Sequence, residues 1–167
     1  MEFLIKNFCL FALLVVFSFA ADKPNFSGTW VLDKDKSFSN PPGFDQTMTI
    51  THDGDRIKIE GKQTSARGEV VLDESYTLDG KEADFTPQVQ APNTNPKGKR
   101  KAYWLPTAKG FVVEDVINFD SPDGAVTQNI TRKWQLFAEG NTLTIDSYID
   151  VARGSFETKR VFVRKKS

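Results

Sequence analysis

The stretch NFSGTWVLDKDKS, Asn25 to Ser37, decides the fold. Phe26, Gly28, Trp30 and Leu32 occupy every second position in its first half. Because successive side chains of a β-strand point to opposite faces, these four residues lie on one face of a predicted strand. Two large aromatic side chains on one face need a core to pack in, so the rest of the chain has to supply that core.

The same alternation continues through the rest of the chain in short segments. Turn sequences separate them, such as DGD at 53–55, DG at 79–80, DSPDG at 120–124 and EGN at 139–141. The apolar positions that alternate with polar residues are Met48, Ile50, Ile57, Ile59, Val70, Leu72, Tyr76, Leu78, Phe111, Val113, Ile117, Phe119, Val126, Ile130, Trp134, Leu136, Leu143, Ile145 and Ile149. A last strand is predicted over 156–165, and no convincing amphipathic helix is found.

This pattern predicts an all-β fold, a single antiparallel up-and-down β-barrel of about 8–10 strands without long helices. Closing the sheet buries its apolar face and removes the exposed strand edges. A β-sandwich is the alternative that the same alternation permits. A barrel of this size can hold one small ligand.

Residues 1–20 have the pattern of a cleaved signal peptide. An apolar run from Phe8 to Ala20 ends in the small residues Ser18 and Ala20, at the positions that a signal peptidase reads. The run is shorter than the ~20 apolar residues that a membrane-spanning helix needs. We therefore expect a single domain over 21–167, secreted or periplasmic, without stable membrane insertion after signal removal.

The charge and cysteine content restrict the function further. The chain has 22 basic and 22 acidic residues, and the predicted signal removes one of each, Lys6 and Glu2. Zero net charge argues against a nucleic-acid partner and against attraction to anionic membranes. Cys9, the only cysteine, lies in the predicted signal, so the exported domain has to be stable without disulfides.

The opening stretch resembles the first strand of the calycins, the superfamily of lipocalins and fatty-acid-binding proteins. Those chains begin with the pattern Phe-x-Gly-x-Trp-x-Leu, which here is Phe26 to Leu32. TKRVFVRKK, 158–166, is similar to the last strand of fatty-acid-binding proteins, and DGDRIKIEG and YTLDGKE are similar to their middle hairpins. The resemblance implies a lipocalin-like β-barrel over 21–167, closest to small secreted bacterial lipocalin-like proteins.

Two features depart from these families. Fatty-acid-binding proteins have a helix–turn–helix lid between their first two strands, but here only DKDKSFSNPPGFD, 33–45, intervenes. Lipocalins have a helix after the barrel, whereas this sequence ends with its last predicted strand. The ligand gating of either family therefore does not transfer to this chain.

The resemblance implies that Phe26, Gly28 and Trp30 close one end of the barrel. In these folds a basic side chain near the C-terminal strands stacks over the Trp, an interaction worth ~0.5–2 kcal/mol. Gly28 would let the backbone pass close by. Direct contact of Trp30 with a ligand is the alternative role.

Arg160 is expected to point inward, because it shares strand parity with Phe156 and Phe162. A buried guanidinium needs a partner. Two partners remain open at this point, the ring of Trp30 and the carboxylate of a bound ligand. The resemblance implies the second, since fatty-acid-binding proteins carry an inward Arg-x-Tyr pair, although Phe162 here lacks the tyrosine hydroxyl.

Trp134, Tyr103 and Trp104 complete the predicted ligand-binding residues, as apolar contacts beside Arg160 and Phe162. Tyr103 and Trp104 follow a basic cluster in the Pro-containing loop predicted over 85–101; its members are Lys97, Lys99, Arg100 and Lys101. The cluster either lies in solvent or attracts an anionic headgroup at the barrel mouth. In the second case 85–96 would form a flap over the mouth.

Catalytic and metal sites find little support in the sequence. His52 is the only histidine and is expected at the end of a turn, so we expect no metal and no cofactor. Neighbouring acids such as Glu114 and Asp115 point to opposite faces of a strand and form no dyad. A Ser-His-Asp or Cys-His site is equally unsupported, which favours a protein that is not an enzyme.

The sequence therefore predicts an exported β-barrel that binds a small hydrophobic ligand, with an acidic group as an open feature. The alternative is a cavity-free barrel that acts through its surface as a binding or inhibitor module. An enzyme built in the barrel mouth is a third candidate. The oligomeric state stays open.

Overall fold

The structure is a computed structural model that describes residues 23–38, 44–66, 68–87, 96–121 and 124–166. The predicted signal peptide, 1–20, lies outside the described residues. So does most of the predicted flap, 88–95. Within the described ranges, no helix is long and apolar enough to cross a membrane.

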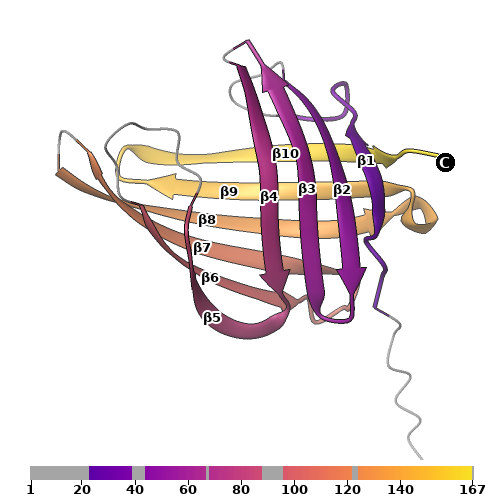
Figure 1. The fold of residues 1–167 in the computed structure, drawn as a ribbon, viewed down its shortest axis with the longest axis horizontal. Coiled ribbons are helices and arrows are strands. Elements are labelled where there is room, and N and C mark those ends of the chain that lie inside the picture. The colour runs from indigo at the N-terminus through magenta and orange to yellow at the C-terminus, as the bar shows by residue number, and fades with distance from the viewer. Residues whose placement is uncertain (1–22, 39–43, 67, 88–95, 122–123, 167) are drawn as a thin grey trace, which may run out of the picture.

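Ten antiparallel strands form one sheet that curls into a barrel (Figure 1). The strands are β1 (Gly28–Leu32), β2 (Asp45–Asp53), β3 (Arg56–Ser65), β4 (Gly68–Thr77), β5 (Asp79–Phe85), β6 (Lys97–Trp104), β7 (Gly110–Ser121), β8 (Gly124–Phe137), β9 (Thr142–Val151) and β10 (Gly154–Arg164). The only helical segment of the described residues is the 3-10 turn η1 (Ala138–Gly140). The predicted all-β barrel is confirmed, and the chain does not form the alternative sandwich.

Strand order explains how the barrel closes. Neighbours in sequence pair with each other from β1 to β4 and from β5 to β10, and β1 pairs with β10 to join the two halves. The described residues form no backbone ladder between β4 and β5, the two edges of the sheet. The barrel is therefore nearly closed, with one open seam.

The closed end of the barrel is built around Trp30. Phe26 and Trp30 have no exposed surface, and the Trp30 indole Nε1 donates a hydrogen bond of 3.0 Å to the Phe26 carbonyl. The basic side chain over the indole ring belongs to Arg164, whose guanidinium carbon lies 4.3 Å from the ring centroid. A cation does stack on Trp30, but Arg160 is the wrong candidate for it.

Gly28 is needed for this closure. Its φ is +138°, a region that favours glycine, and a Cβ atom there would come within 2.4 Å of Arg164 Nη1. The missing side chain leaves room for the guanidinium, which donates hydrogen bonds to the carbonyls of Gly140 and Ser27.

One segment differs from the sequence prediction. Residues 97–101 were expected in a loop, but β6 begins at Lys97 and pairs with β5 and β7. Lys99 and Lys101 are exposed on its outer face, and Lys99 forms an ion pair with Glu82 on β5. Arg100 faces inward instead. Alternation splits this basic run between solvent and the barrel interior.

Candidate functional site

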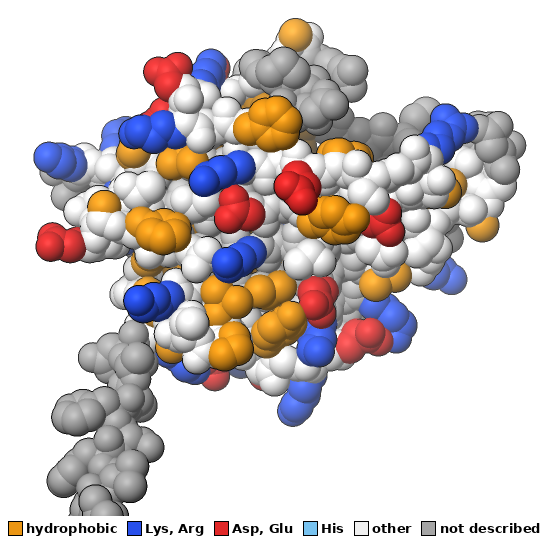
Figure 2. All heavy atoms as spheres, turned by 180° about the vertical axis from the view of Figure 1, so that it is seen from behind, with side chains coloured by type: hydrophobic (Ala, Val, Ile, Leu, Met, Phe, Trp, Pro, Cys, Tyr) orange, Lys and Arg blue, Asp and Glu red, His pale blue; other side chains and the backbone are white. Residues whose placement is uncertain are grey.

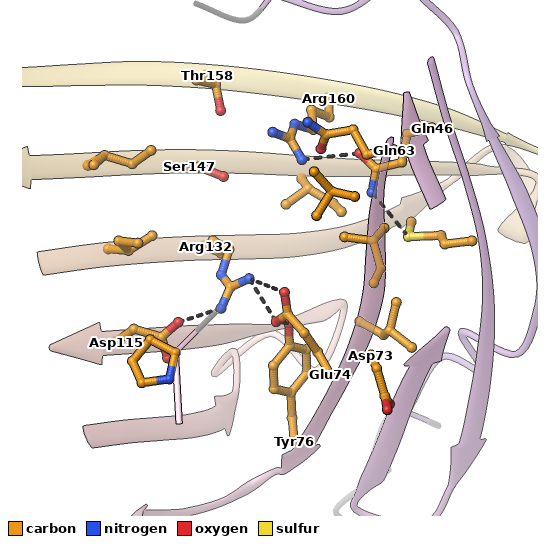
Figure 3. A pocket seen from close by; sticks show the side chains of 18 of the residues that line it. Gln46, Gln63, Asp73, Glu74, Tyr76, Asp115, Arg132, Ser147, Thr158 and Arg160 are labelled. Atoms are coloured by element: carbon orange, nitrogen blue, oxygen red, sulfur yellow. Dashed lines mark hydrogen bonds and ion pairs between the residues drawn. The ribbon is translucent and has the colours of Figure 1, made fainter. Parts of the chain in front are cut away.

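The barrel encloses a cavity of about 780 Å³. Its apolar lining includes Phe44, Met48, Ile59, Leu72, Phe85, Ile117, Ile130, Trp134, Ile145, Ile149 and Phe156. Its polar lining includes Gln46, Gln63, Glu74, Tyr76, Arg100, Asp115, Arg132, Ser147, Thr158 and Arg160 (Figure 3). An apolar cavity with a few converging polar groups is the usual form of a small-molecule site.

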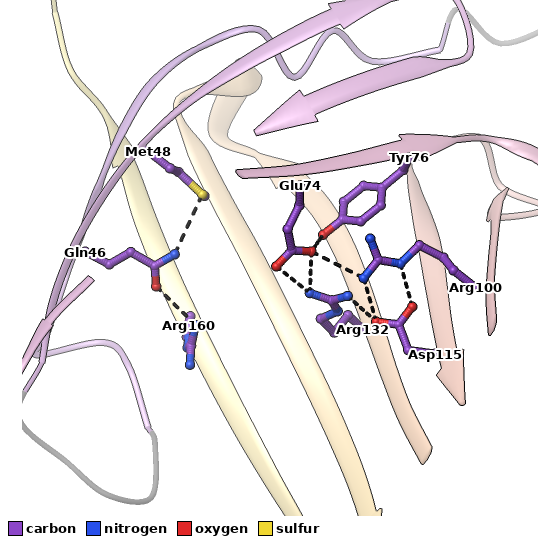
Figure 4. A network of polar contacts seen from close by, with 8 residues as sticks. All are labelled: Gln46, Met48, Glu74, Tyr76, Arg100, Asp115, Arg132 and Arg160. Carbon is purple, nitrogen blue, oxygen red and sulfur yellow. Dashed lines mark hydrogen bonds and ion pairs between the residues drawn. The ribbon is translucent and has the colours of Figure 1, made fainter. Parts of the chain in front are cut away.

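Five of these residues form a buried charge network that spans the cavity (Figure 4). Arg100 Nε and Nη2 donate to both oxygens of Asp115, at 2.6 and 2.9 Å. Arg132 donates to Asp115 and, at 3.0 Å from Nη1, to Glu74 Oε2. The hydroxyl of Tyr76 donates to the same Glu74 oxygen. Two arginines and two carboxylates therefore neutralise each other.

The network fixes the charge state of its members. Burial raises the pKa of Glu74, but the positive charges of Arg132 and Arg100 and the hydrogen bond from Tyr76 outweigh burial and hold that pKa below its ordinary value. Burial raises the pKa of the Tyr76 hydroxyl far above its ordinary value. Neither group is therefore poised to transfer a proton near neutral pH.

Arg160 is a partly buried cation that this network does not neutralise. No carboxylate of the described residues lies within ion-pair distance of it. Its Nη1 donates to Gln46 Oε1 at 3.1 Å, and its guanidinium carbon lies 4.6 Å from the centroid of the Phe44 ring. Burial, and then the nearby charge of Arg132, lowers the pKa of Arg160 to about 10.

The interior also has unused hydrogen-bond donors. Three buried N–H groups have no partner among the described residues: Nε of Arg132, Nε1 of Trp134 and Nε of Arg160. All three residues line the cavity. Because buried polar groups are normally paired, three unpaired donors and one uncompensated cation favour a site that receives hydrogen-bond acceptors.

Two of the predicted ligand-binding residues line this cavity. Arg160 and Trp134 flank Ile145 in one row across β10, β9 and β8. Phe162 points inward as expected but lies fully buried in the core instead of in the lining. It is two residues closer to the closed end than Arg160, where the interior is filled with side chains.

Tyr103 and Trp104 lie away from the cavity. Tyr103 is on the outer face of β6, where its hydroxyl donates to Glu114 at 2.8 Å. Trp104 covers the closed end and donates from Nε1 to Asp55 at 2.8 Å. Both residues end β6, which runs toward the closed end, so neither lies near the mouth as the sequence prediction required.

The residues before the undescribed segment do contact the cavity. Phe85, Thr86 and Pro87 are part of its lining, and the Arg100 guanidinium lies 4.0 Å from the centroid of the Phe85 ring. The first residues of the predicted flap therefore lie at the cavity. The flap role of 88–95, which lie outside the described residues, stays a prediction.

The single histidine has a structural role at the closed end. His52 Nδ1 accepts a hydrogen bond from the Phe26 backbone N–H at 3.3 Å, and Nε2 lies 2.9 Å from the Gly54 carbonyl. A neutral ring with its proton on Nε2 satisfies both contacts. The described residues hold no cluster of three metal-binding side chains.

Sequence reasoning missed most of the network, namely Glu74, Arg100, Asp115 and Arg132. The signal that could have revealed it is a charged residue in the parity of an apolar face. Asp115 stands between Val113 and Ile117, and Arg132 between Ile130 and Trp134. Four charged residues at inward positions of different strands could have been interpreted as one cluster inside the barrel, because buried charges need partners.

The comparisons with known proteins show the fold. No protein-family model matches the chain, and no curated protein matches its sequence. Zebrafish ileal bile acid-binding protein, solved in complex with cholic acid, aligns with a TM-score of 0.51 and 14% identity, over 84% of this chain and 98% of that one. Human cRBP IV aligns with a TM-score of 0.49 and 15% identity, over 85% and 99%. Together with its strand order, the alignment to the zebrafish protein shows that the chain shares the barrel fold of that protein.

Proposed function

We propose that this protein is an exported barrel that holds one small hydrophobic ligand with a single acidic group. The observation that carries the proposal is Arg160, a partly buried cation that faces a largely apolar cavity without a carboxylate partner among the described residues. The exported, lipocalin-like character rests on the signal pattern of residues 1–20 and the cysteine-free domain that follows it.

The cavity has the dimensions of a ligand site. Its volume of about 780 Å³ lies in the range of about 300–1,000 Å³ that small-molecule sites occupy. Side chains such as Met48, Ile59 and Leu72 form one wall, and Ile130, Ile149 and others form the opposite one. A ligand enclosed there would bury apolar surface on both sides, at about 25 cal/mol per Å².

The charge count supports a monoanion. Among the described residues three arginines line the cavity, and Glu74 and Asp115 neutralise two of them, which leaves one positive charge in the lining. A carboxylate at Arg160 would compensate it and form charge-assisted hydrogen bonds. The structural neighbour from zebrafish was crystallised with an acid of this amphipathic kind, cholic acid. Phe162 supplies no hydroxyl, so Arg160 and Gln46 would hold the headgroup.

Two alternatives are less well supported. A surface-binding module would need a filled interior, and this barrel has a large cavity. The exposed apolar side chains include Phe38, Val71 and Phe137, and Figure 2 shows charged residues interspersed with the apolar ones on one face. A barrel-mouth enzyme would need a proton donor or acceptor near neutral pH, whereas the pKa values of Glu74 and Tyr76 are moved away from it.

Native mass spectrometry of the protein purified from its own host tests the proposal. We expect a co-purified small molecule, which organic extraction releases and which negative-ion spectra identify as a monocarboxylic acid. A protein that carries no small molecule, and that binds neither long-chain acids nor their alcohols in titrations, would refute it.

A further inference from the structure

A polar row crosses the apolar wall of the cavity between Arg160 and the mouth. Strand register places Arg132 on β8, Ser147 on β9 and Thr158 on β10 directly beside one another. All three side chains line the cavity, and Figure 3 shows them on three adjacent strands. We call these three residues the polar row.

The hydrogen-bonding capacity of this row is not used within the barrel. Thr158 is only 7% exposed, and among the described residues neither its hydroxyl nor that of Ser147 has a hydrogen-bond partner. Arg132 bonds the carboxylates through its terminal nitrogens, and its Nε–H has no partner in the described part of the chain. Two hydroxyls and one N–H that line the cavity are therefore free to form hydrogen bonds with a ligand oxygen.

The position of the row relative to Arg160 is set by strand geometry. Arg160, Ile145 and Trp134 form the next row toward the closed end, so the two rows are about 6.8 Å apart along the strands. On the mouth side, Ile130, Ile149 and Phe156 form an apolar row. A ligand with its acid at Arg160 would therefore meet the hydroxyls close to its headgroup and then the apolar row of Ile130, Ile149 and Phe156.

We propose that the polar row binds an oxygen substituent, a hydroxyl or carbonyl, on the ligand near its acidic end. The cavity then prefers oxygenated long-chain acids to plain ones. This inference rests on the proposed function, because it takes the acid to lie at Arg160. It adds a second recognition point on strands β8, β9 and β10.

Binding of stearate and of hydroxystearates that differ only in hydroxyl position, measured by titration calorimetry on the purified protein, tests the inference. One hydrogen bond to the row should tighten binding by about 3- to 10-fold relative to stearate. The gain should be largest for a hydroxyl near the carboxyl group and should vanish for one near the tail. The double variant Ser147→Ala/Thr158→Val should lose this gain, so that it binds the hydroxystearates no more tightly than it binds stearate.

Thr131→Val is the matched control, because Thr131 lies beside Arg132 on β8 but is exposed on the outer face. It should keep the preference. The stearate affinity of the double variant also checks its folding, and Thr158→Val alone serves if the double variant does not fold. Equal binding of all these acids by the wild type, or a preference that survives in the variants, overturns the polar row but leaves the proposed function. Failure to bind any of the acids overturns both.

Discussion

Replacing Arg160 with Met removes the uncompensated charge while keeping most of the side-chain volume. Arg160 is partly buried beside Phe44 and Gln46, and the loss of solvent around it lowers its pKa from an ordinary 12.5 to about 10. A lowered pKa means that the folded state disfavours the cation, so at neutral pH the charge reduces stability. That penalty is fully present below pH 10 and is relieved as the pH rises from there toward 12.5.

The balance of the substitution can be worked from these contacts. The lowered pKa corresponds to about 3 kcal/mol of destabilisation that Met removes, which is an upper estimate. Against this, the ring of Phe44 loses a cation, worth about 1 kcal/mol, and Gln46 Oε1 loses a donor, worth about 1 kcal/mol more. We expect the ligand-free protein to hold its stability or gain about 1 kcal/mol.

Ligand binding should change in the opposite direction. Removing one partner of a buried charge pair costs about 2–5 kcal/mol, so the affinity for palmitate should fall by about 30-fold or more. Hexadecanol, which has the same chain and no charge, should bind Arg160→Met about as well as it binds the wild type.

Urea unfolding, monitored by Trp fluorescence, measures the change in stability. Calorimetric titration with palmitate measures the change in affinity. Lys159→Met is the matched control, because Lys159 precedes Arg160 on β10 and is exposed, so it loses the same charge on the outer face. The reasoning is refuted if Arg160→Met loses more than about 2 kcal/mol of stability and still binds palmitate normally. Arg160 would then be a structural residue whose charge the fold already compensates.

Further predictions concern the closed end, the network and the signal. Trp30→Ala should lose about 3–5 kcal/mol of unfolding free energy in urea, as a fully buried aromatic residue cut to Ala does. Arg164→Met should lower the melting temperature and shift Trp fluorescence without any ligand, since its guanidinium covers that ring. The lowered pKa of Glu74 stabilises the folded state above the ordinary pKa of 4.5, and this stability is lost as the pH falls below that value. The unfolding free energy of Glu74→Gln, measured at decreasing pH, should therefore fall less steeply than that of the wild type. Intact mass of the exported protein should show Ala21 as its first residue, and a reducing agent should leave its melting temperature unchanged.

The strands could be predicted from sequence because one periodicity dominates the chain. Side chains that alternate between a core and solvent leave a two-residue pattern, and tight turns separate the repeats. The prediction was wrong for 97–101, because the prolines that precede these residues suggested a loop that continued up to Lys101. In 97–101 the exposed residues Lys97, Lys99 and Lys101 do alternate with the inward residues Gly98 and Arg100. This alternation is hard to recognise in the sequence because both faces carry basic residues.

The choice between basic residues could not be made from sequence. Arg160 and Arg164 are four residues apart on β10 and share the same parity, so alternation assigns both to the inner face. What separates them is the register against β1, which places Arg164 opposite Trp30 and Arg160 deeper in the barrel. Register across the first and last strands depends on closure of the whole sheet, and no local pattern reports it.

The network also explains why Arg160 is the cavity-lining arginine without a carboxylate partner among the described residues. The seam between β4 and β5 has no backbone ladder among the described residues, yet Glu74 of β4 forms ion pairs with Arg132 of β8 and Arg100 of β6. These contacts tie the edge strand to the far half of the barrel where hydrogen bonds between strands are missing. Because they use both carboxylates of the network, the third arginine of the cavity lining, Arg160, is left for a ligand. The same ion pairs that brace the open seam therefore set the charge that the cavity offers.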